Sequence, residues 1–196
     1  MADSTSHVAV GVVMRAQDGT LEVLLDHGRL PEAVLRGGET LEAALGRAVD
    51  VSALAHVEQL ETRVLGNGSV ATAYLGLVPS ESHLGGAWRP AAGIALPFVR
   101  AAQSRLRAKL SYTNLGFALA PKTFTISELR EVYVAALGHD VSATNLQRVL
   151  IRRGVLERVD GRRAPGRSGG RPAALFRFAS DRLEVTDEFA ALRPPR

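Results

Sequence analysis

The fold of this chain is decided by the stretch from Thr125 to Phe178, whose sequence is TISELREVYVAALGHDVSATNLQRVLIRRGVLERVDGRRAPGRSGGRPAALFRF. Thr125 and Glu128 have the spacing of a capping box, and Gly138 stands where a helix would end. A second segment with helical periodicity follows over residues 142–154. The stretch therefore begins with two helices that are separated by a short turn.

A basic hairpin is predicted after the second helix. Residues 155–159 and 174–178 have strand-like composition, and Asp160 and Gly161 form a turn signal between them. The intervening residues are rich in glycine and arginine. Helix, helix and basic hairpin in this order predict a winged helix-turn-helix, a module that holds duplex DNA.

The second helix has the two faces that a recognition helix needs. At about 100° per residue, Asn145, Arg148 and Arg152 fall within an arc of about 60°, whereas Leu146 and Leu150 point toward the core. Arginine can bond guanine O6 and N7, and asparagine can bond adenine N6 and N7. The helix pattern alone is equally compatible with a solvated face, and the basic hairpin tips the interpretation toward DNA.

Hairpin arginines are expected to contact phosphates or the minor groove, because the neighbouring glycines let the backbone approach closely. The residues predicted to contact DNA are Ser142, Asn145, Arg148, Arg152, Arg162, Arg163, Arg167 and Arg171.

The charge distribution supports a polyanionic partner for one half of the chain only. Residues 99–178 carry 15 Arg and Lys against 5 Asp and Glu, whereas residues 1–98 carry 6 against 11. The chain has no cysteine, which excludes disulfides and thiolate metal sites. No signal-peptide pattern and no apolar run of membrane-spanning length is present, so a cytoplasmic protein without a membrane partner is expected.

The N-terminal half alternates strand-like segments with short helical ones, which predicts a mixed α/β domain and an α+β protein overall. Strands are expected over residues 7–15, 21–26, 57–65 and 70–78, and helices over residues 40–51 and 97–110. We divide the chain into a domain over residues 1–98, a connecting helix over 99–111 and the winged helix over 112–196.

Two segments resemble a known family. Residues 35–47, LRGGETLEAALGR, resemble a worn Nudix box, and Trp88-Arg89-Pro90 with the segment that follows resembles the end of a Nudix domain. Residues 124–173 resemble the winged helix of the Nudix-related transcriptional regulators of NrtR type. This resemblance implies a repressor linked to NAD metabolism, with ADP-ribose or a related nucleotide as its effector.

The resemblance also implies that hydrolysis has been lost. A working box places metal-binding carboxylates on one helix face. Here Glu39 and Arg47 keep the family spacing, but Ala48 and the pair Val51-Ser52 stand where glutamates are required, and Leu54 replaces the closing glycine. No catalytic residue, metal or cofactor is therefore predicted, and the protein is not expected to be an enzyme.

Two interpretations of the remnant stay open. In one, Glu39 and Arg47 form a structural pair and the domain serves as a homodimerisation platform; in the other, the old pocket still binds a nucleotide effector, with Arg36, Arg47 and Trp88 as contacts. Two other functions are possible: a Nudix-type nucleotide hydrolase with a basic regulatory tail, and a DNA-binding protein without sequence preference or effector.

Overall fold

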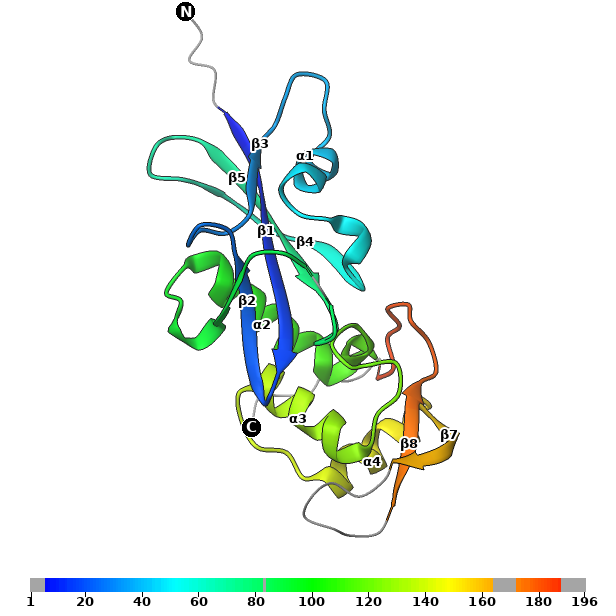
Figure 1. Ribbon diagram of the computed structural model, residues 1–196. Coiled ribbons are helices and arrows are strands. Elements are labelled where there is room, and N and C mark those ends of the chain that lie inside the picture. The colour runs from blue at the N-terminus through cyan, green and yellow to red at the C-terminus, as the bar shows by residue number, and fades with distance from the viewer. Residues whose placement is uncertain (1–5, 83, 164–171, 188–196) are drawn as a thin grey trace, which may run out of the picture. The chain divides into compact units, whose positions relative to one another are not determined.

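The computed structural model describes residues 6–82, 84–163 and 172–187, and its contacts divide the chain into two compact units (Figure 1). Unit 1 comprises residues 1–15 and 21–105, and unit 2 comprises residues 16–20 and 106–196. The chain passes from unit 1 to unit 2 within helix α2 (Pro97–Tyr112). The domain boundaries expected from the sequence lie on either side of this passage and stay a prediction.

Unit 1 is built on a mixed sheet. Its strands lie in the order β4-β5-β1-β2-β6, and β3 pairs with β1. The β1–β5 pair is parallel, and the β1–β3, β2–β6 and β4–β5 pairs are antiparallel. The elements are β1 (His7–Gln17), β2 (Thr20–Leu25), β3 (Glu32–Val34), α1 (Leu41–Ala48), the 3₁₀ turn η1 (Val51–Ala53), β4 (His56–Val64), β5 (Val70–Leu77), β6 (Ala87–Pro90) and the 3₁₀ turn η2 (Ala91–Gly93).

The central strands β1 and β5 are buried along almost their whole length, which explains their continuous apolar sequences. Helix α1 packs Ala44 and Leu45 into a cluster with Ala9, Val13 and Tyr74 of the sheet. The mixed α/β fold of the N-terminal half is as predicted. Strands β3 and β6 were not predicted, because segments of three and four residues carry too little periodicity.

Helix α1 ends earlier than its sequence pattern predicts. The expected helix runs to residue 51, but Val49 adopts an extended backbone, with φ −147° and ψ 145°. The side chain of Asp50 then accepts a hydrogen bond from the Ser52 backbone and caps the turn η1. Aspartate favours such caps over a helix interior, so the helix stops at Ala48 and a differently wound turn follows.

Unit 2 consists of a helical core and a two-stranded hairpin. Its elements after α2 are the 3₁₀ turn η3 (Leu115–Ala118), α3 (Ile126–Leu137), α4 (Ala143–Arg152), β7 (Leu156–Arg163) and β8 (Ala173–Phe178). Phe124, which precedes α3, exchanges backbone hydrogen bonds of 2.9 and 2.8 Å with Phe176 of β8. This isolated bridge joins the fully buried Phe124 to the hairpin.

Local sequence signals locate both helices of unit 2. Thr125 and Glu128 form the predicted capping box, and Gly138 ends α3 in the left-handed conformation, with φ 75°. The predicted turn at Asp160 and Gly161 is wrong, however, because β7 continues to Arg163. Its pairing with β8 shifts register between Val159 and Arg162, so the glycine accommodates a bulge at φ 105° rather than a hairpin turn.

None of the helices within the described ranges has the length and apolarity needed to cross a bilayer.

Candidate nucleic-acid interface and effector pocket

Helix α4 separates an apolar face from a polar one. Leu146 and Leu150 are buried, whereas Asn145, Arg148 and Arg152 are exposed, as their spacing predicts. The remaining exposed residues of this face, which sequence analysis did not single out, are Thr144 and Ile151. An exposed polar stripe on a helix fixed by two buried leucines can enter a major groove.

Ser142 begins the helix rather than standing free on its surface. Its side chain caps α4 by accepting from the backbone N–H of Asn145, at 3.4 Å. Asn145 in turn accepts, through Oδ1, a hydrogen bond of 2.8 Å from Nη2 of Arg148. Three of the predicted DNA-contacting residues therefore form one connected group at the start of α4.

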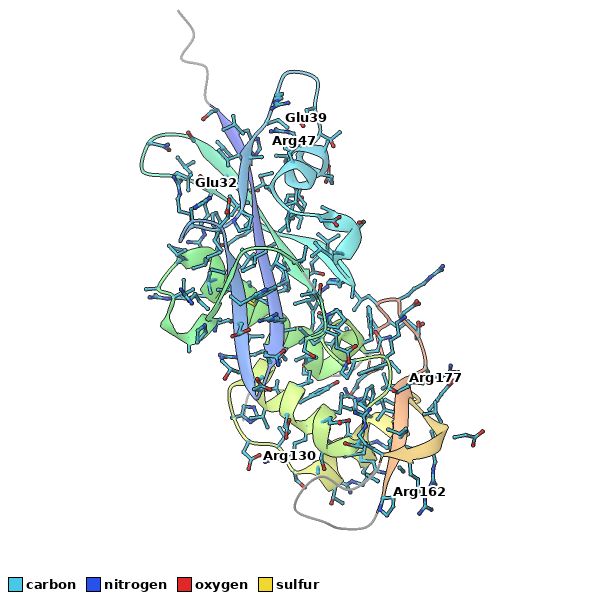
Figure 2. The ribbon with its side chains drawn as sticks, viewed as in Figure 1. Glu32, Glu39, Arg47, Arg130, Arg162 and Arg177 are labelled. Atoms are coloured by element: carbon cyan, nitrogen blue, oxygen red, sulfur yellow. The ribbon has the colours of Figure 1, made fainter. Side chains whose placement is uncertain are left out.

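The turn between α3 and α4 is braced by Arg130, a residue that sequence analysis missed. Its Nε donates to the carbonyl of Val141 at 2.8 Å, and its Nη2 pairs with Asp140. Figure 2 shows Arg130 on α3, close to this turn. An arginine on a helix surface has no local sequence signal for such a role, because its partners lie 10 and 11 residues further along the chain.

The arginines of the hairpin divide into two kinds. Arg163 pairs with Glu128 at 3.0 Å and donates to the Thr123 carbonyl at 3.3 Å, so it ties β7 to the start of α3. Arg162 is exposed on the same strand and is drawn pointing outward in Figure 2. The other two predicted contacts, Arg167 and Arg171, lie outside the described residues.

The remnant of the box is organised around Glu39. Arg47 donates to both of its carboxylate oxygens, from Nε at 2.9 Å and from Nη2 at 2.8 Å, and Nη2 also reaches the carbonyl of Val34 at 2.6 Å. The backbone N–H of Arg36 adds a third hydrogen bond to Glu39, at 3.0 Å. The bonds from Arg47, and then the one from Arg36, lower the pKa of Glu39 to about 2.

The three predicted effector contacts have different surroundings. Arg47 is engaged by Glu39, and the side chain of Arg36 is exposed on the preceding loop. Trp88 is half-buried on β6, and the guanidinium of Arg15 lies over its ring at 4.2 Å from the centroid. Within the described ranges, no hydrogen bond or ion pair joins Trp88 to either arginine of the box.

Metal-binding potential was also sought. Over the residues that the structure describes, no group of three or more His, Asp or Glu side chains is arranged to hold a metal ion. At the box itself, Ala48 is the last residue of α1, and Val51 and Ser52 stand in the turn η1.

A cavity of about 450 Å³ lies in unit 1 between the segment before β3, the β4–β5 turn and the start of α2. Its lining is mostly apolar, with the charged residues Arg29, Glu32 and Arg63. Arg29 pairs with Glu32, and Arg63 pairs with Glu61 at 2.6 Å while lying 5.9 Å from the ring centroid of Phe98. Sequence analysis missed this cavity because its walls come from separate segments.

Comparison with known proteins identifies the C-terminal domain. Residues 116–178 match the family model for the NrtR DNA-binding winged helix domain. The crystal structure of Shewanella oneidensis NrtR complexed with a 27mer DNA resembles this chain with a TM-score of 0.67 and 25% identity, over 87% of this chain and 92% of that one. The chain has the NrtR organisation. A Nudix-like domain is followed by an NrtR winged helix, as the sequence resemblance implies.

Two further relatives support this assignment to different extents. A MutT/nudix family protein from Enterococcus faecalis has a TM-score of 0.63 over 92% of this chain and 90% of that one, but its 17% identity extends the likeness to the fold alone. The ADPR responsive transcriptional repressor NtrR of Acinetobacter baylyi is 40% identical over 76 residues. That match covers 39% of this chain and 29% of the relative, less than a third of its length.

Proposed function

We propose that this NrtR-type protein is a sequence-specific transcriptional repressor that binds operator DNA as a homodimer and responds to an ADP-ribose-like nucleotide. The observation that carries the proposal is α4, which exposes Asn145, Arg148 and Arg152 from a winged helix of the NrtR family. Repression follows if the dimer occupies a promoter. The printed name of the Acinetobacter relative, an ADPR responsive repressor, supports this direction of control.

In the proposed complex, α4 lies in the major groove and the β7–β8 hairpin contacts the backbone. Arg148 and Arg152 meet base edges, whereas Arg162, Arg167 and Arg171 neutralise phosphates. Arg163 is already paired with Glu128, so its contribution is to hold the hairpin in place as well as to add positive charge.

A homodimer is proposed because a single recognition helix makes few base contacts. A two-fold dimer on a palindromic operator doubles them. Residues 1–98 are the proposed contact, since they carry net negative charge, whereas the strongly positive residues 99–178 of two copies repel each other.

The cavity beside the start of α2 is the proposed effector site. Arg29 and Arg63 can supply cationic contacts to a pyrophosphate, and the apolar walls can cover a base or sugar. Each arginine has a glutamate partner, so the anion must compete for the guanidinium groups. The surface around Arg36, Arg47 and Trp88 is the second candidate location.

Hydrolysis of the bound nucleotide is not part of the proposal, because the positions that would hold metal carry Ala48, Val51 and Ser52. Turnover of ADP-ribose with Mg²⁺ or Mn²⁺ that disappeared in a Glu39→Gln variant would instead favour a hydrolase with a basic tail.

The decisive experiment is selection of bound sequences from random DNA with the full chain, followed by titrations on the selected site and a scrambled one. A palindromic motif is expected, and Arg148→Ala should cost about 1–3 kcal/mol on that motif. Arg167→Ala should weaken both DNAs and lower the salt slope by about one per site lost. A control variant, Arg89→Ala on β6, removes equal charge outside the winged helix. Failure to enrich any motif would leave a DNA-binding protein without sequence preference.

Effector location is tested by titrating ADP-ribose into the protein and into the operator complex. Arg63→Gln is expected to weaken ADP-ribose binding about tenfold, since it removes a charge-assisted contact. Arg36→Gln and Trp88→Ala should leave it unchanged. The opposite pattern would place the site at the remnant of the box.

A further inference from the structure

The hydrogen bond between Arg148 and Asn145 changes what helix α4 presents to a base edge. Nη2 of Arg148 donates to Oδ1 of Asn145 at 2.8 Å, and both side chains are exposed on the helix surface. Residues three apart on a helix are neighbours, so the pair forms without strain in either side chain. The amide is further anchored close to the helix start, where the Asn145 backbone donates to the capping Ser142.

An asparagine that recognises adenine needs both ends of its amide. Oδ1 accepts from the adenine N6 amino group while Nδ2 donates to N7. Here Oδ1 already accepts from a cation, and a base amino group approaching it would meet the guanidinium N–H groups at the same place. The two donors of Nδ2 and the other guanidinium donors of Arg148 remain.

We propose that Asn145 and Arg148 act as one recognition unit that presents only donors, and that this unit selects guanine at two neighbouring positions of each half-site. Guanine offers two acceptors in the major groove, N7 and O6, whereas adenine offers N7 beside a donor. The inference rests on the proposed function, because it concerns bases read by α4. It replaces adenine, the base expected for asparagine alone, with guanine.

The unit also makes Arg148 a specificity-determining residue at two positions. It contacts its own base directly, and through Oδ1 it sets which base Asn145 accepts. Removing the guanidinium therefore frees the amide oxygen and allows Asn145 to pair with adenine. This coupled change distinguishes the unit from two independent readers, for which each substitution alters a single position.

The test is selection from random DNA with the full-length protein and three variants. Asn145→Ala locates the position that Asn145 reads, since preference is lost there. Arg148→Met retains an unbranched side chain without the donors. At the position located by Asn145→Ala, the ratio of guanine to adenine should fall about tenfold or more in Arg148→Met. Arg152→Ala is the matched control, because it removes an arginine from the same face and should leave that position unchanged.

The outcomes separate this inference from the proposed function. Wild-type selection of adenine at the located position, or an unchanged guanine in Arg148→Met, would overturn the paired unit while leaving DNA recognition by α4 intact. A motif insensitive to all three variants would show that another element reads the operator, and no enrichment by the wild type would remove the proposed function. Melting curves of each variant establish that losses do not come from unfolding.

Discussion

Glu39 is held by two side-chain hydrogen bonds from Arg47 and one backbone bond from Arg36. These contacts join the loop before α1 to the helix itself, and the third reach of Arg47, to the Val34 carbonyl, adds the end of β3. The pair therefore has a structural role whether or not a ligand binds nearby. A charge that has become part of the scaffold is a poor candidate for a proton acceptor.

The lowered pKa of Glu39 has a measurable consequence for stability. Its folded-state pKa is about 2 and its ordinary value 4.5, so its contribution is present above about pH 4.5 and is lost as pH falls toward 2. Glu39→Gln should lower the urea midpoint at pH 7, and the difference from wild type should shrink between pH 4.5 and 2. Glu81→Gln, at an exposed loop position, is the control. A difference that stayed constant over this pH range would contradict the pair's ionic character.

Arg162 and Arg163 are adjacent in β7 but are expected to differ in function. Arg163 is tied to Glu128 and to the Thr123 carbonyl, whereas Arg162, within the described part of the chain, has neither a hydrogen bond nor an ion pair. Arg162→Ala should lower the salt slope of DNA binding by about one without changing stability. Arg163→Ala should destabilise the fold by at most about 1 kcal/mol, since the pair is partly exposed. Equal salt slopes in both variants would refute the distinction.

At the scale of elements, the features predicted well are those with a local cause. The capping box of α3, the left-handed Gly138 and the polar stripe of α4 depend on residues within one or two turns of each other. Three features depend on distant partners or competing caps: the brace from Arg130, the tie from Arg163 and the early end of α1. Sequence periodicity contains no information on such contacts, so these parts of the site appeared only with the fold.

Two glycines provide a matched test of helix interior and helix end. Gly46 lies inside α1 with open space around its Cα, so Gly46→Ala should stabilise the protein by about 0.5–1 kcal/mol. Gly138 ends α3 at φ 75°, and an added Cβ would lie 2.8 Å from Nη2 of Arg107. Gly138→Ala should therefore destabilise by about 1–2 kcal/mol. Urea unfolding of both variants measures the two signs, and a shift in the same direction for both would contradict the assigned caps.

At the scale of the whole molecule, the charge distribution separates the two proposed activities. The positive residues 99–178 meet DNA, and the negative residues 1–98 are left to meet a second copy or an effector. We expect the full chain to be dimeric in light scattering. Hydrogen exchange at decreasing protein concentration should lose protection within residues 1–98, and not in α4. Concentration-dependent protection confined to the winged helix would refute this dimer.

The early end of α1 bears on evolutionary reversibility. Restoring glutamates at 48, 51 and 52 would place only the first on α1, because the other two stand in the turn η1 that Asp50 caps. The three carboxylates would then lack the common helix face that metal binding requires. A lineage that regained the lost residues one at a time would gain no hydrolysis from any of them until the helix was lengthened. The short helix thus acts as a ratchet, which keeps an ancestral enzyme fold committed to regulation.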